Sequence, residues 1–137
     1  MENVYPYVNY LIEVGHVSLD YELFRGGGEP VRDDMLAYDN LFNASVDAFA
    51  WVMEKEGFGG WEVVVAESGE AEGMANVLAF NGNVVRRAVR GAGTPKRPSV
   101  GVEVYLFGLF DENKKVGKEY ERHFGLNGTR AYNLNFS

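Results

Sequence analysis

Apolar residues recur at helical spacing between Tyr38 and Glu56, the clearest pattern in the chain. One side of the projected helix carries apolar side chains and the opposite side carries polar ones. The predicted inward stripe is Tyr38, Leu41, Phe42, Ala48, Phe49, Val52 and Met53, and the predicted solvent stripe is Asp39, Asn43, Asp47 and Glu54. Gly57 follows as a natural stop. The pattern predicts an amphipathic helix.

A weaker helical pattern covers Met74 to Arg90. The predicted inward residues are Val77, Val84, Val85 and Ala88. Between Ile12 and Leu36 no period is sustained, so this stretch is expected to be a long connection. A connection of that length in a compact domain usually has a function.

Three segments predict strands. Asn3–Tyr10 is rich in Val and Tyr and is interrupted by Pro6, which favours a strand that ends in a rigid turn. The β-branched run Trp61–Ala66 is typical of a parallel strand buried on both faces, and it is expected to end at Glu67. Gly101–Phe110 predicts another buried strand.

The predicted order is strand, helix, strand, helix, strand, which indicates an α/β fold with parallel crossovers and helices that cover the sheet. Three strands do not close a barrel. The length of 137 residues and the hydrophobic content of 46% predict a single domain over residues 1–137.

Charge and composition exclude several classes of function. The net charge of −7 argues against binding to nucleic acid or to an anionic membrane, because both need a broad positive field. No apolar run of membrane-spanning length occurs, and the first residues do not show the pattern of a signal peptide. The chain has no cysteine, which excludes a thiolate nucleophile and cysteine-ligated zinc.

Two further groups of residues give only weak indications of a metal site or of a polyanion-binding site. His16 and His123 lack the spacing of a metal pair. The basic residues Arg86, Arg87, Arg90, Lys96 and Arg97 could contact a polyanion, but a helix end followed by a solvated turn explains them better.

The carboxyl ends of the predicted strands gather residues suited to a sugar site. Functional groups in parallel α/β folds collect at these ends. Tyr5, Tyr7 and Tyr10 belong to the first end, Glu67 to the second, and Glu112 and Lys115 to the third. Aromatic rings stack on sugars, and a glycosidase needs two carboxyl groups. The alternative for Glu67 is a carboxylate that ends a strand and is merely solvated.

Several ordered segments resemble plant glucan endo-1,3-β-glucosidases of glycoside hydrolase family 17. They are NVYPY at 3–7, VSLDYELF at 17–24, VVVAESG at 63–69, GTPKRP at 93–98, YLFGLFDENKK at 105–115, ERHFGL at 121–126 and AYNLNF at 131–136. The resemblance implies a partial (β/α)8 barrel, corresponding to strands six to eight, without the earlier βα units.

The resemblance also implies roles for individual residues. Glu67 aligns with the family nucleophile, and Glu112 and Lys115 match residues that shape the cleft. Tyr5 and Tyr7, with Tyr10 beside them, match the aromatic strand end that lines the glucose subsites. The general acid of the family lies in a V-G-N-E type motif, which is absent here. The family's Trp-Pro after E-[ST]-G is replaced by a Glu70-Ala71 pair, which removes packing and adds negative charge.

The implied activity is hydrolysis of internal β-1,3-glucosidic bonds with retention of configuration. No cofactor is expected, because this chemistry needs only water as the second substrate. The expected partner is β-1,3-glucan, and open barrel edges predict self-association. The family is mostly located in the cell wall, outside the cell, or in the vacuole. The alternative is a catalytically inactive remnant that binds glucan weakly.

Overall fold

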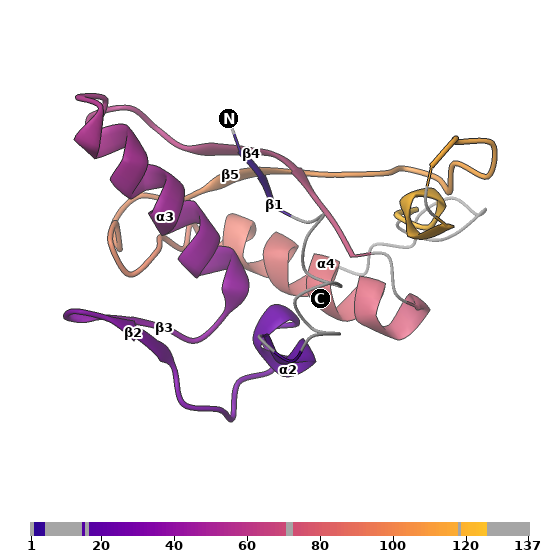
Figure 1. The fold of residues 1–137 in the computed structure, drawn as a ribbon, viewed down its shortest axis with the longest axis horizontal. Helices are drawn as coiled ribbons and strands as arrows, with labels where there is room; N and C mark the ends of the chain where they lie inside the picture. Colours follow the sequence, from indigo (N-terminus) through magenta and orange to yellow (C-terminus); the bar gives the residue numbers. More distant parts are fainter. Residues whose placement is uncertain (1, 5–14, 16, 71–72, 118, 126–137) are drawn as a thin grey trace.

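The computed structural model describes residues 2–4, 15, 17–70, 73–117 and 119–125 (Figure 1). Three strands, β1 (Glu2–Val4), β4 (Val64–Ser68) and β5 (Glu103–Leu106), form one sheet in the order β1-β4-β5. Both neighbouring pairs are parallel. The predicted parallel α/β arrangement is therefore confirmed, with β4 at the centre of the sheet.

Two long helices follow the strands, as predicted. Helix α3 (Leu41–Lys55) begins after Asn40, whose side-chain oxygen accepts a hydrogen bond from the backbone N–H of Asn43 at 2.8 Å. This is the usual way to satisfy a free donor at a helix start. Helix α4 (Met74–Val89) begins after Gly73 and ends with Arg86 and Arg87 in its last turn.

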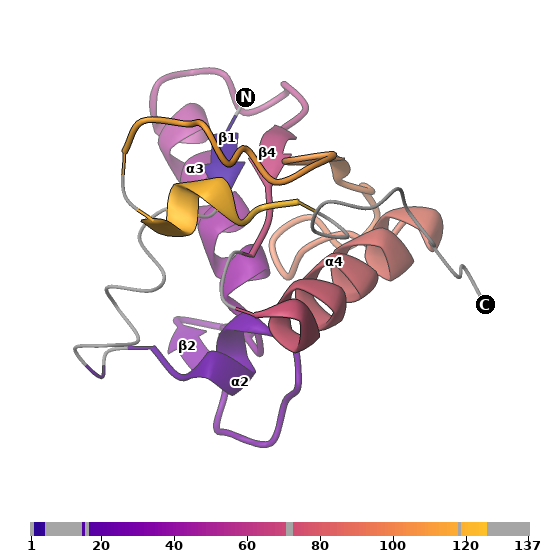
Figure 2. The same ribbon diagram turned by 90° about the vertical axis from the view of Figure 1, so that its right-hand side faces the viewer.

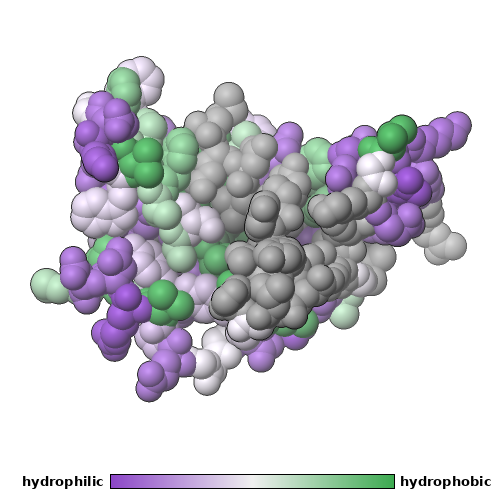
Figure 3. All heavy atoms as spheres, viewed as in Figure 1, coloured by the Kyte–Doolittle hydropathy of each residue, from purple (hydrophilic) through white to green (hydrophobic). Residues whose placement is uncertain are grey.

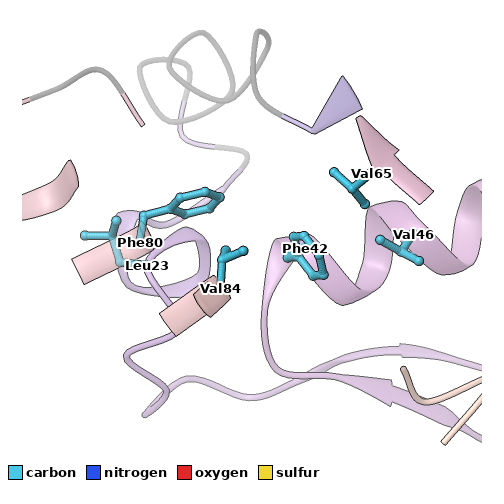
Figure 4. Packing of buried hydrophobic residues seen from close by; sticks show 6 residues of the cluster. All are labelled: Leu23, Phe42, Val46, Val65, Phe80 and Val84. Carbon is cyan, nitrogen blue, oxygen red and sulfur yellow. The ribbon is translucent and has the colours of Figure 1, made fainter. Parts of the chain in front are cut away.

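The core lies between the sheet and the helices (Figure 4). Val65 of β4 meets Phe42 and Val46 of α3, and Phe80 and Val84 of α4 complete the cluster with Leu23. Residues of both helices belong to one cluster with this side chain of the central strand, so both helices cover the same face of the sheet. The two helices and the core form a layer on one face of the sheet, which we call the helical layer.

The inward stripe predicted for α3 is wrong in part. The buried residues of the helix are Phe42, Asn43, Val46, Asp47 and Ala50. Ala48 is exposed and Val52 is 58% exposed. The helix is therefore rotated relative to the prediction, so that two polar residues expected in solvent are inside.

Long-range polar contacts explain this rotation. Asp47 is completely buried, and its Oδ2 accepts a hydrogen bond from the backbone N–H of Lys96 at 2.9 Å. Thr94, two residues before Lys96, is also buried. A buried polar group costs less free energy when it has a partner, and Asp47 finds one 49 residues further along the chain.

The inward residues predicted for α4 are confirmed in part. Val77 and Val84 are buried, together with Phe80 and Asn81, which the prediction omitted. Ala88 is exposed, contrary to the prediction, because it belongs to the last turn of the helix, beyond the core cluster.

The strands are shorter than predicted, and their positions differ. Strand β4 starts at Val64 and runs through Glu67 to Ser68, and Trp61 is exposed before it. Strand β5 covers only Glu103–Leu106, with exposed and half-buried residues in alternation. Because β5 is at the edge of the sheet and the helices cover one face, it is not buried on both sides. Strand β1 starts at Glu2; Tyr5 to Tyr10 of the predicted strand lie outside the described residues.

The stretch predicted as a long connection contains regular structure. Helix α2 (Leu19–Glu22) is capped by the hydroxyl of Ser18. Strands β2 (Val31–Asp33) and β3 (Leu36–Tyr38) pair in antiparallel fashion around a two-residue turn at 34–35. Asp34 has a φ of 50°, in the left-handed region that Asp tolerates better than most residues.

The segment from Phe107 to Gly125, which includes the 3-10 helix η1 (Glu119–Arg122), extends beyond one end of the sheet (Figures 1 and 2). On the face shown in Figure 3, apolar and polar side chains are interspersed. None of the helices in the described part of the chain is both long enough and apolar enough to cross a bilayer.

Candidate active site

The carboxyl ends of the three parallel strands share one edge of the sheet, which we call the carboxyl edge. Glu67 is the last residue but one of β4, the central strand. It is half-buried and pairs in register with Asn3 of β1. The structure thus places Glu67 where the sequence predicts it, at the edge where parallel α/β folds collect functional groups.

The two residues after Glu67 are held closely by the segment that follows β5. The carbonyl oxygen of Ser68 accepts a hydrogen bond from the N–H of Phe107 at 2.9 Å, and Ser68 is completely buried. A Cβ atom at Gly69 would lie 3.2 Å from Cδ1 of Phe124 and 3.5 Å from the carbonyl oxygen of Phe107. The absence of a side chain at Gly69 therefore permits this close approach.

The segment from 107 to 125 is closed by hydrogen bonds between its two halves. The backbone N–H of Glu112 donates to the carbonyl of Arg122 at 3.1 Å, and Nε of Arg122 donates to the carbonyl of Lys115 at 2.9 Å. The N–H of Gly125 donates to Oδ1 of Asp111 at 2.9 Å. These bonds hold the DENKK region in one defined conformation beside the strand end.

Glu112 and Lys115 form an ion pair, with 3.5 Å between Oε2 and Nζ. The Lys115 ammonium also lies 5.1 Å from the centre of the Phe107 ring, a distance that suits a cation–π contact. Because Phe107 is hydrogen-bonded to Ser68, Lys115 is connected to the end of β4 through one residue. A cation held there favours a carboxylate or a developing negative charge nearby.

The sequence prediction did not identify the aromatic pair that joins the site residues. Phe107 and Phe124 meet edge to face, with 5.5 Å between ring centres. Gly108 has a φ of 83°, and a Cβ atom there would lie 2.6 Å from the carbonyl oxygen of Phe124. The sequence carries one signal of this contact. Phe-Gly-Leu occurs at 107–109 and again at 124–126, and a glycine often marks a close approach of two backbone segments.

Three predicted site residues cannot be placed: Tyr5, Tyr7 and Tyr10 lie outside the described residues. Glu70, one of the acidic residues that follow the motif, is nearly fully buried rather than solvated. Within the described ranges, no group of three or more His, Cys, Asp or Glu residues could hold a metal ion.

Comparison with known proteins gives one consistent result. An acidic isoform of glucan endo-1,3-beta-glucosidase from Zea mays is 42% identical over 147 aligned positions, covering 100% of this chain and 43% of that protein. The solved structure of CJP38, a beta-1,3-glucanase and allergen of Cryptomeria japonica pollen, matches with a TM-score of 0.81 at 41% identity, covering 92% of this chain and 41% of CJP38.

A second solved structure, from a study of two plant beta-glucan endohydrolases with distinct substrate specificities, matches with a TM-score of 0.83 at 34% identity. It covers 98% of this chain and 45% of its own. These solved relatives are barrel glucanases, and the chain corresponds to part of their α/β fold. It spans less than half the length of these relatives.

The family profile described as "Glycosyl hydrolases family 17" matches residues 1–136, almost the whole chain. The chain therefore belongs to glycosyl hydrolases family 17.

Proposed function

We propose that this chain supplies the nucleophile side of a retaining glycosidase site that hydrolyses internal bonds of β-1,3-glucan. The observation that carries the proposal is the position of Glu67. It lies at the carboxyl edge of the central strand in a family 17 chain whose relatives are named as endo-1,3-beta-glucosidases. In this proposal residues 1–137 act as one domain equivalent to strands six to eight of the barrel.

Glu67 acts as the nucleophile. Its carboxylate oxygen forms a bond to the anomeric carbon, and the bond from that carbon to the leaving oxygen breaks, with the electron pair going to the oxygen. Water then attacks the anomeric carbon of the glycosyl ester and gives one proton to the conjugate base of the general acid. The sugar is released with its original configuration, and the carboxylate of Glu67 is regenerated. The two inversions account for retention.

The neighbouring residues support this chemistry. Lys115, between Glu112 and Phe107, contributes a positive charge to the same edge of the sheet as Glu67. Tyr5, Tyr7 and Tyr10 provide ring faces on which glucose units stack.

The general acid comes from outside these 137 residues. A retaining site has its two carboxyl groups about 5 Å apart, and the V-G-N-E type motif of the family acid does not occur in this sequence. The chain spans 43% of the Zea mays relative, so the proposal assigns the acid to a segment equivalent to the remainder of that relative. The family location, the cell wall, extracellular space or vacuole, is proposed for this chain too.

A substrate that needs no acid tests Glu67 by itself. In 2,4-dinitrophenyl β-laminaribioside the leaving phenolate departs without a proton, so the nucleophile alone can form the glycosyl-enzyme. We expect the purified chain to release dinitrophenolate and to gain one laminaribiosyl group, located on Glu67 by peptide mass spectrometry. Glu67→Gln removes the nucleophile and should lower the rate at least about 1000-fold.

Glu62→Gln is the matched control, because it makes the same substitution just before the opposite end of β4. It should leave adduct formation unchanged. Adduct on another carboxylate, or equal rates for wild type and Glu67→Gln, would refute the assignment. Binding to insoluble β-1,3-glucan without any adduct would instead identify the chain as the inactive, weakly binding remnant.

A further inference from the structure

A cavity of about 350 Å3 lies in the helical layer, apart from the carboxyl edge. It is lined by Asp39 and Asn40 just before the start of α3 and by Asn83, Arg86, Arg87 and Arg90 along the last turns of α4. No residue of β4, β5 or the 107–125 segment lines it. Glucan hydrolysis as proposed above makes no use of this cavity.

Arg87 is the central residue of this cavity. Its Nη2 donates a hydrogen bond to the carbonyl of Gly93 at 2.7 Å, and its Cζ lies 5.6 Å from the centre of the Phe42 ring. These contacts fix the guanidinium plane. Its Nε is buried and has no hydrogen-bond acceptor among the described residues. A buried charged donor without an acceptor is costly, and negative charge in the adjoining cavity lowers that cost by electrostatic attraction.

The charges around the cavity point the same way. Three arginines and one carboxylate, that of Asp39, belong to the lining of the cavity, in a protein whose net charge is −7. One oxygen of Asp39 already accepts a hydrogen bond from Nδ2 of Asn40 at 2.6 Å. Asn40 is also the N-cap of the 15-residue helix α3, so the positive end of that helix dipole adjoins the cavity.

A helix end with a solvated turn does not account for all of these features. That interpretation explains basic residues in the last turn of α4, where they complement the dipole. It does not explain why Arg87 is half-buried and partly desolvated. Burial lowers the pKa of Arg87, while the carboxylates of Asp39 and Asp47 oppose this shift. The protein therefore keeps a cation in an environment that penalises the charge.

We propose that this cavity binds a small oxyanion, a phosphate or a carboxylate, between the half-buried Arg87 and the exposed Arg86 and Arg90. Guanidinium groups present paired donors that match both kinds of anion. The volume, in the lower range of known ligand pockets, accommodates the anion on a group as large as one sugar. Asn83 adds a neutral polar group to the lining.

Calorimetric titration of the full chain at low ionic strength tests the site. The probes are inorganic phosphate, glucose 6-phosphate, glucuronate and, as the uncharged control, glucose. We expect at least one charged probe to bind and glucose not to bind. Binding of phosphate and glucose 6-phosphate alone would identify a phosphate site, and binding of glucuronate alone would identify a carboxylate site. Raising the salt concentration should weaken the affinity.

Substitutions then locate the bound anion. Arg87→Lys keeps the charge but loses the fork of donors, and it should weaken binding about 10-fold. Arg86→Gln and Arg90→Gln remove exposed charges and should each weaken binding about 3-fold while the fold stays intact. The test therefore does not depend on Arg87→Lys alone. Arg32→Gln on exposed β2 is the control with the same charge change.

Two results would overturn the proposal. The first is the absence of any heat of binding with every charged probe at concentrations up to about 10 mM, a range in which even weak sites are detected. The other is an equal loss of affinity in Arg32→Gln and in the two α4 variants, which would indicate only a general effect of net charge.

Discussion

The helical layer and the carboxyl edge differ in how far they bury Asp47 and Glu67. In the helical layer Asp47 is completely buried, and its Oδ2 accepts a hydrogen bond from the backbone N–H of Lys96. At the carboxyl edge Glu67 is only half-buried, at the end of a strand and beside a loop that carries Lys115. The first carboxylate joins two distant segments. The second lies at the end of its strand, where it is partly exposed.

The two regions also differ in how their backbone is held. Side-chain packing around Val65 holds the helical layer, whereas the edge depends on close backbone approaches at Gly69, Gly108 and Gly125. Backbone approaches of this kind leave no room for an added atom. The difference indicates that stability resides mainly in the helical layer, whereas close backbone contacts shape the edge.

Truncation of the core should have the largest effect on stability. Phe42 is 2% exposed and packs against Phe24, with 6.0 Å between ring centres. Phe42→Ala should lower the free energy of unfolding by about 3–5 kcal/mol, because it removes apolar side-chain surface that is buried on folding and leaves a cavity in its place. Urea unfolding followed by circular dichroism measures this. Phe58→Ala, at a position 49% exposed, should cost far less, and a similar loss for both would contradict the proposed division.

A single methyl group should disrupt the edge without unfolding the helical layer. Ala at 108 would place Cβ 2.6 Å from the carbonyl oxygen of Phe124 and hold a φ of 83°, so Gly108→Ala should destabilise the edge by roughly 2–4 kcal/mol. Hydrogen exchange should speed up in residues 107–125 and stay unchanged in α3. Gly57→Ala is the matched control, because its φ is 88° but no atom lies within 4 Å of the new Cβ. Faster exchange in α3 as well would show that the two regions are one cooperative unit.

The same contrast explains what the sequence could predict. The parallel α/β arrangement and the two long helices follow from local sequence patterns, and the sequence predicts the extents of α3 and α4 to within a few residues. The inward face of α3 depends on Lys96, far along the chain, so periodicity assigned Asp47 to solvent. Strands β2 and β3 have only three residues each, too few to show alternation.

For the candidate site, sequence reasoning located the strand end but not its surroundings. Glu67 follows a recognisable β-branched run, and the motif around it resembles a family, so its position was predictable. The contacts of Ser68 and Gly69 with Phe107 and Phe124 join segments that are about 40 and 55 residues apart. The glycines that follow Phe107 and Phe124 mark close backbone approaches, but nothing local in the sequence indicates which segments meet.

Alkaline pH should reveal the buried polar part of the helical layer. Tyr38 is buried, and burial together with the nearby carboxylate of Asp47 raises its pKa to about 12 from 10.0. A raised pKa in the folded state means that the unfolded chain loses its proton first. Stability is therefore fully present below pH 10 and declines as the pH rises towards 12. We expect wild type to lose more stability than Tyr38→Phe over this interval, measured by urea unfolding at each pH. Parallel curves for the two proteins would show that Tyr38 is not responsible.

The smallest effect is expected at the surface ion pairs that fasten the 94–97 turn to α3. Glu54 lies 2.7 Å from Nζ of Lys96 and 3.6 Å from Nη2 of Arg97, and the hydrogen bond from Lys96 lowers the pKa of Glu54 below 4.5. A lowered folded-state pKa gives stability that is present above pH 4.5 and lost as the pH falls through the folded value. Glu54→Gln should therefore be slightly less stable than wild type at pH 7 and equal to it at about pH 3, with the difference reduced by salt. Glu56→Gln, at the exposed C-cap of the same helix, should show no such pH dependence. An equal response of both variants would mean that the pairs do not hold the turn, and that the hydrogen bond from Lys96 to Asp47 is sufficient.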